Sequence, residues 1–118
     1  MFLLGKKDES GKMTWVAVGQ SGLVPPGRSL VVEANGLRVL LCNSSAGLTA
    51  VESICSHLAL PLDKGRIIGD QLICPHHGAR FDLKNGCPLA GAALRPLRTF
   101  QVAEREGAVW VYLPVENG

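Results

Sequence analysis

The residues able to bind a metal centre lie close together in this chain. All three histidines and two of the four cysteines belong to two short motifs, C-S-H at residues 55–57 and C-P-H-H at residues 74–77. Thiolates and imidazoles are ligands that zinc, copper and iron–sulfur centres accept. The spacing therefore predicts one four-ligand site to which each motif gives one sulfur and one nitrogen. The predicted ligands are Cys55, His57, Cys74 and His77.

Two kinds of centre accept two thiolates and two imidazoles. Common zinc modules pair Cys with Cys and His with His. A Rieske [2Fe–2S] centre instead binds one iron through two Cys and the other iron through two His. Because each motif here mixes the two ligand types, the pattern favours a Rieske cluster. A zinc-stabilised binding module without a redox role is the alternative from a different functional class.

The segment between the motifs must bring them side by side. Residues 66–68 and 71–73 are short runs on either side of Gly69-Asp70, which is typical of a two-residue turn. A hairpin returns its two ends to the same place. We therefore expect this hairpin to place the two motifs next to each other.

The rest of the chain has the pattern of a β-rich protein. Glycine (14 residues) and proline (7 residues) punctuate short apolar runs, and Asn35-Gly36 and Asn85-Gly86 are strong turn signals. No stretch combines a helical period with start and stop signals. We expect one all-β domain of antiparallel sheets, sandwich or barrel-like. The predicted strands are residues 15–18, 29–33, 37–42, 48–51, 66–68, 71–73, 80–83, 99–103 and 108–113.

The two motifs and the residues that follow them resemble the Rieske iron–sulfur motif. The second motif continues through G-A-R-F-D-L at residues 78–83 to Asn85-Gly86, similar to the F-D-x-x-x-G that often follows it in this family. In length the chain is similar to the free Rieske ferredoxins of bacterial ring-hydroxylating dioxygenases, and the likeness covers about residues 15–113. It implies a single Rieske domain over residues 1–118, a cluster-binding subdomain at about residues 52–87, and one [2Fe–2S] cluster per chain.

The same resemblance implies a one-electron carrier in aromatic hydrocarbon catabolism. It would accept electrons from a ferredoxin reductase and pass them, by transient docking, to a terminal oxygenase. We do not expect an enzyme, because such an oxygenase also needs an iron held by two His and one carboxylate, and only His76 remains beside the four ligands. The close alternative is the small Rieske-like subunit of an assimilatory nitrite reductase.

Respiratory Rieske proteins differ from this chain around the cluster. The cysteines that form their extra disulfide correspond to Leu60 and His76, so that bridge is not expected here. The serine and tyrosine whose hydroxyls donate to sulfur in those proteins correspond to Ala79 and Phe81. Such hydrogen bonds stabilise the reduced cluster, and without them the reduction potential falls. We predict a potential at the low end of the Rieske range, about −150 mV.

Composition and the order of residue types argue against some classes of partner and indicate a cellular location. The net charge is only +2, the basic residues are scattered, and the chain has two Trp and one Tyr for stacking, so we expect no nucleic-acid partner. No apolar run approaches the roughly 20 residues that span a bilayer, so we expect no membrane partner. The first residues do not follow the order of a signal peptide, which predicts a cytoplasmic protein.

The remaining chemistry-bearing residues have simpler interpretations. Cys42 ends an apolar predicted strand, so we interpret it as a core residue, and Cys87 follows a turn. A disulfide between them is conceivable, although the cytosol disfavours it. His76 is interpreted as a solvated surface residue.

Basic residues and prolines flank the motifs. The basic residues form either a rim that steers an acidic partner or ordinary solvated strand edges. Pro88 and residues 91–96 form either a loop covering the cluster or a simple connection between sheets. The basic residues are Lys64, Arg66, Arg80 and Lys84.

Overall fold

The protein is described by a computed structural model that covers residues 12–53, 65–74, 79–90 and 96–115. Every regular element in these ranges is a β-strand, and none of them holds a helix long and apolar enough to cross a membrane. The expected all-β fold is confirmed. The strands are β2 (Met13–Gln20), β3 (Ser29–Ala34), β4 (Leu37–Ser44), β5 (Gly47–Glu52), β6 (Arg66–Ile68), β7 (Gln71–Ile73), β8 (Arg80–Asp82), β9 (Pro88–Ala90), β10 (Thr99–Phe100), β11 (Val102–Arg105) and β12 (Ala108–Pro114).

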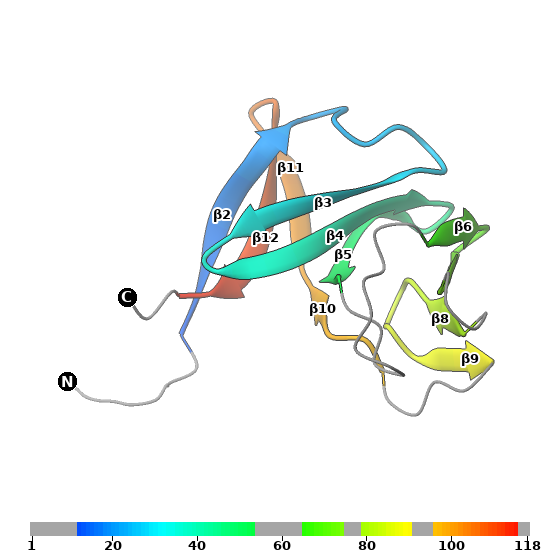
Figure 1. Ribbon diagram of the computed structural model, residues 1–118. Helices are drawn as coiled ribbons and strands as arrows, with labels where there is room; N and C mark the ends of the chain where they lie inside the picture. Colours follow the sequence, from blue (N-terminus) through cyan, green and yellow to red (C-terminus); the bar gives the residue numbers. More distant parts are fainter. Residues whose placement is uncertain (1–11, 54–64, 75–78, 91–95, 116–118) are drawn as a thin grey trace.

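The strands form three antiparallel sheets (Figure 1). The first has the order β10-β5-β4-β3, the second has the order β11-β12-β2, and the third has the order β6-β7-β8-β9. The third sheet, called the small sheet below, is a meander of strands no longer than three residues. Figure 1 shows it at one side of the molecule, with β2, β11 and β12 at the other side and β3–β5 between them.

Strand β4 lies in the middle of this arrangement. Its residues Val39, Leu40, Leu41 and Cys42 are all 0% exposed. Successive side chains of a strand point to opposite faces, so the continuous burial means that both faces of β4 are covered. This explains why the sequence has an unbroken apolar run there instead of an alternating one.

Each face of β4 contributes to a separate hydrophobic core. Val39 and Leu41 pack with Val109, Val111 and Leu113 of β12, so this core joins the first and second sheets. The other core joins the first sheet to the small sheet. It contains Leu40, Cys42, Val51, Leu72, Cys74, Ala79, Phe81, Leu83 and Leu97. The small sheet is therefore held on the scaffold by buried apolar contacts.

Most predicted strands and turns agree with the structure. Asn35 and Gly36 have φ values of 51° and 75°, which is the type I′ geometry that matches the twist of a two-residue hairpin. They join β3 to β4 with paired residues from Ala34 and Leu37 outward. The predicted hairpin around Gly69-Asp70 is also present, as β6 and β7.

Two elements differ from the prediction. The single strand predicted at 99–103 is divided: β10 pairs with β5, whereas β11 pairs with β12. The chain changes sheets at Gln101, whose carbonyl accepts a hydrogen bond from Tyr112 N–H at 2.9 Å. The second difference is β9, which was not predicted because it has three residues and begins with proline. A proline is tolerated there because it is the first residue of an edge strand.

Candidate metal centre

The small sheet fixes both ends of the second motif. Strand β7 ends at Ile73 and β8 begins at Arg80, and these two residues are paired. One step further along, Cys74 N–H donates to the Ala79 carbonyl at 2.7 Å. The backbone on either side of residues 75–78 is therefore held at hydrogen-bonding distance, as expected for a motif presented by a hairpin.

Cys74 is the predicted ligand that the structure describes. Its side chain is 2% exposed and belongs to the core that includes Leu72 and Phe81. Burial and hydrogen bonding around the sulfur ligands set the potential of an iron–sulfur centre, and a buried cysteine shields such a centre from water on its side. Position, burial and donor type of Cys74 thus fit a cluster ligand.

The other predicted ligands Cys55, His57 and His77, together with His76, lie outside the described residues. Within the described ranges there is no group of three or more His, Cys, Asp or Glu side chains that could hold a metal ion. The four-ligand set therefore remains a prediction from the motifs.

The chain leading to the first motif is also fixed. Glu52 N–H donates to the Arg98 carbonyl at 2.9 Å, and the Glu52 carboxylate accepts from Arg98 N–H at 3.1 Å. Ser53 N–H then donates to the Arg38 carbonyl at 3.3 Å. The chain thus leaves β5 in a defined position two residues before Cys55.

Ser53 carries no signal in the sequence that would have drawn attention to it. It is 2% exposed, and its Oγ is buried without a hydrogen-bond partner among the described residues. A buried hydroxyl without a hydrogen-bond partner costs free energy. This cost distinguishes Ser53, which lies just before the first motif, from an ordinary apolar core residue. Only the burial in the folded chain makes this serine conspicuous.

Ala79 and Phe81 lie where respiratory Rieske proteins carry hydroxyl groups. Both side chains are 0% exposed and belong to the same core as Cys74. Neither side chain has a hydrogen-bond donor. The two side chains that enter this core after the second motif are therefore both apolar.

The two cysteines outside the motifs behave as interpreted. Cys42 is a fully buried core residue, and desolvation by burial raises the pKa of its thiol to about 12. Cys87 is exposed, and the two are not joined by a disulfide. The Cys87 N–H donates to Asn85 Oδ1 at 2.9 Å, which places this cysteine in the turn predicted from Asn85-Gly86.

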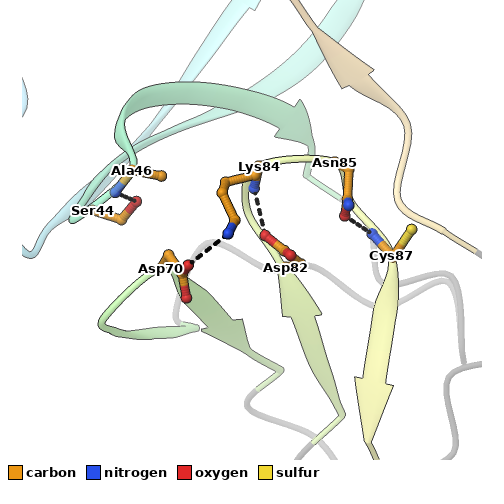
Figure 2. A network of polar contacts seen from close by, with 7 residues as sticks. All are labelled: Ser44, Ala46, Asp70, Asp82, Lys84, Asn85 and Cys87. Carbon is orange, nitrogen blue, oxygen red and sulfur yellow. Dashed lines mark hydrogen bonds and ion pairs between the residues drawn. The ribbon is translucent and has the colours of Figure 1, made fainter.

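The flanking basic residues have different environments. Arg66 and Arg80 are exposed, whereas Lys84 Nζ lies 3.3 Å from Asp70 Oδ2 (Figure 2). Lys64 lies outside the described residues. All three side chains are exposed, but Lys84 is ion-paired, whereas neither arginine forms an ion pair with a described residue, a distinction that the sequence did not make.

The proposed cover segment is described only at its margins. Pro88 of β9 pairs with Phe81 of β8, so Pro88 belongs to the small sheet and not to a loop. Residues 91–95 lie outside the described ranges, and the chain resumes at Pro96.

Comparisons with known proteins agree with the motif and the fold. The model of the Rieske [2Fe-2S] domain family matches residues 14–101. The methanesulfonate monooxygenase ferredoxin subunit of Methylosulfonomonas methylovora is 30% identical over 105 residues, which are 88% of this chain and 85% of the relative. The cytochrome b6-f complex iron-sulfur subunit of Chlorobaculum tepidum is 31% identical over 96 residues, but these make up 52% of that protein and 81% of this chain.

A solved structure extends the similarity to three dimensions. The structure described as "Complex of reduced oxygenase and oxidized ferredoxin in carbazole 1,9a-dioxygenase" matches with 28% identity and a TM-score of 0.77, covering 88% of this chain and 96% of the other. These matches decide between the two centres that the motifs left open, because the family is defined by an iron–sulfur cluster and not by zinc. The chain belongs to the Rieske [2Fe–2S] domain family, and its cofactor is a Rieske-type [2Fe–2S] cluster.

Proposed function

We propose that this protein is a one-electron carrier that takes electrons from a ferredoxin reductase and delivers them to the terminal oxygenase of a multicomponent ring-hydroxylating system. The observation that carries the proposal is the extent of the match. The family model covers 14–101, and the chain spans 85% of a monooxygenase ferredoxin subunit. That relative is named a ferredoxin subunit of a monooxygenase, which supports the role of a carrier for an oxygenase.

The proposed cluster ligands are Cys55, His57, Cys74 and His77. The buried position of Cys74 supports its role, and the anchored chain at Ser53 supports a fixed approach to Cys55. When bound, the cluster supplies a site that accepts and releases one electron. His76, next to His77, is assigned no role in binding it.

Apolar side chains around Cys74 tune the proposed site. Leu72, Phe81 and Leu97 bury the region around Cys74, and no hydroxyl lies at position 79 or 81. Fewer donors to sulfur leave the reduced, more negative state less stabilised. We propose that the potential lies near the low end of the Rieske range, about −150 mV.

We also propose a single domain over residues 1–118, with a cluster-binding subdomain at about residues 52–87. The core shared by β4, β5 and the small sheet supports one folding unit, since Leu40, Val51 and Phe81 belong to it together. The cytoplasm is the proposed location, where a reductase and an oxygenase would be available to a carrier.

The proposal is tested by analysing the purified protein for metal and sulfide, and by recording its low-temperature EPR spectrum after dithionite. Two irons, two acid-labile sulfides and a rhombic signal with an average g below the free-electron value are expected. The reduced protein should then transfer its electron to a terminal oxygenase encoded beside it. An oxygenase that stays oxidised while the carrier is fully reduced would contradict the assigned role.

The nitrite reductase alternative makes a different prediction. A stable enzyme subunit would purify in complex with a large protein that contains flavin and haem, whereas a carrier purifies alone. Affinity purification from the native cells at physiological salt, followed by absorption spectroscopy, distinguishes the two.

A further inference from the structure

The outer face of the small sheet has no partner among the described elements. Ile67, Leu72 and Phe81 point into the core that the small sheet shares with β4 and β5. Because side chains alternate along a strand, the residues on either side of them point to the opposite face. Arg66 and Arg80 are exposed on this outer face, and Ile73 is partly exposed.

Arg66, Ile73 and Arg80 form one row across the outer face. Arg66 is paired with Ile73, and Ile73 is paired with Arg80. The two arginines are therefore separated by two strand spacings, about 10 Å between Cα atoms, with an apolar side chain between them. Ile68, which is 52% exposed, follows on the same face of β6. We call Arg66, Ile68, Ile73 and Arg80 the basic face.

The row lies at the end of the sheet to which both ligand motifs are attached. Arg66 follows the segment 54–64 that contains the first motif, and Ile73 and Arg80 bracket Cys74 and residues 75–78. A protein that contacts this row would therefore be placed beside the connections to both motifs.

Charge is distributed unevenly along the small sheet. At the opposite end, Lys84 Nζ is 3.3 Å from Asp70 Oδ2, and Asp82 Oδ1 accepts from Lys84 N–H at 2.8 Å (Figure 2). Positive charge is thus balanced at the turn end. Arg66 and Arg80 form no ion pair with any described residue, so among the described side chains the positive charge without an ion-pair partner lies at the end with the motifs.

We infer that the basic face is the docking surface for an acidic patch on the terminal oxygenase. Two exposed guanidinium groups at this spacing act together, because their separation is close to the Debye length. They would attract carboxylates and orient the carrier with its motif end toward the partner. Ile73 and Ile68 supply the apolar contact between and beside the charges. The inference rests on the proposed function and names the chemistry of the partner.

The test measures how the charge of an oxidant affects electron transfer. Dithionite-reduced holoprotein, freed of excess reductant, is mixed in a stopped-flow instrument with ferricyanide or with tris(phenanthroline)cobalt(III). These oxidants have opposite charge and enough driving force for any Rieske potential. The double variant Arg66→Glu/Arg80→Glu should slow ferricyanide at low salt by about tenfold or more and should speed the cobalt complex. High salt should remove most of both effects.

The matched control is Arg28→Glu/Arg105→Glu, which changes the net charge equally. Both residues are exposed, and both lie outside the small sheet. This control should affect the ferricyanide rate by less than about threefold. Equal slowing in the two double variants would show that net charge alone acts, and would overturn the inference. The neutral variant Arg66→Gln/Arg80→Gln should give an intermediate rate, with circular dichroism and EPR verifying its fold and cluster.

An acidic polypeptide tests docking directly. Poly-L-glutamate should bind the wild-type holoprotein, slow its oxidation by ferricyanide, and fail to do either with Arg66→Glu/Arg80→Glu. Binding that is unchanged by these substitutions would contradict the docking surface. A protein that dithionite cannot reduce would instead contradict the proposed function, so the two failures are distinguishable.

Discussion

Gly86 and Leu97 approach each other more closely than any side chain at position 86 would allow. Leu97 N–H donates to the Gly86 carbonyl at 2.8 Å, and a Cβ on Gly86 would clash with the Leu97 carbonyl oxygen. Gly86 also has a φ of 77° and donates to the Asp82 carbonyl at 2.6 Å. The turn after β8 is thereby joined to the chain that leads into β10.

We expect Gly86→Ala to be much more destabilising than Gly27→Ala. Both glycines have a φ of 77°, but a Cβ at Gly27 meets nothing within 4 Å. Gly27→Ala should therefore cost about 1–2 kcal/mol, which is the cost of the left-handed conformation alone. Gly86→Ala adds an overpacking cost of about 1–3 kcal/mol. Thermal unfolding of both holoproteins checks this, and equal loss in the two variants would refute the close contact.

The fold could be predicted from the sequence where local signals and tertiary pairing agree. The Asn35-Gly36 turn and the buried run in β4 are examples, because turn chemistry and burial are both written in local residue types. The division at Gln101 could not be predicted. Phe100 and Val102 keep the expected alternation, with Phe100 in the core and Val102 packed against it, but pairing partners, and not periodicity, decide where a strand changes sheets.

Part of the candidate site could likewise be predicted from the sequence and part could not. The motif around Cys74 was visible because sulfur and nitrogen donors at such close spacing are typical of metal sites. The Gly86–Leu97 contact and the burial of the Ser53 hydroxyl could not be predicted, since both depend on how separate segments of the chain pack together. Asn85-Gly86 signalled a turn, and only the fold shows that the glycine is also needed for packing.

Replacing each proposed ligand should abolish the cluster. In Cys55→Ser, His57→Ala, Cys74→Ser and His77→Ala, the loss of one ligand should remove the EPR signal and most of the iron and sulfide, because each iron has only two protein ligands. Iron and sulfide analysis with EPR on the purified variants is the measurement.

Two neighbouring substitutions provide the controls for the ligand variants. His76→Ala and Cys87→Ser should keep full iron content and an unchanged EPR line shape, since neither residue belongs to the proposed set. A variant of a proposed ligand that retains a normal spectrum would remove that residue from the assignment, and loss of the cluster in His76→Ala would put His76 in its place.

The apolar positions 79 and 81 predict how the potential responds to a new hydroxyl. Ala79→Ser and Phe81→Tyr add a donor to fully buried positions beside Cys74. If such a bond favours the reduced state by about 1 kcal/mol, the potential should rise by about 40 mV. An EPR-monitored redox titration of wild type and both variants tests this, with Phe81→Leu as the variant that adds no donor. A wild-type potential above about +100 mV would contradict the low-potential proposal.

Cys42 and Cys87 should react very differently with alkylating reagents. The thiolate is the reactive form, and burial raises the pKa of Cys42 to about 12. At pH 9 only about 0.1% of such a thiol is ionised, and the side chain is also fully enclosed. Cys87 is exposed.

Native holoprotein treated with iodoacetamide should therefore gain label at Cys87, while Cys42 is labelled only after unfolding or as the pH approaches 12. Peptide mass spectrometry locates the label, and Cys87→Ser should leave the native protein unlabelled at pH 9. Rapid labelling of Cys42 in that variant would mean that the core on this side of β4 opens far more often than its packing implies.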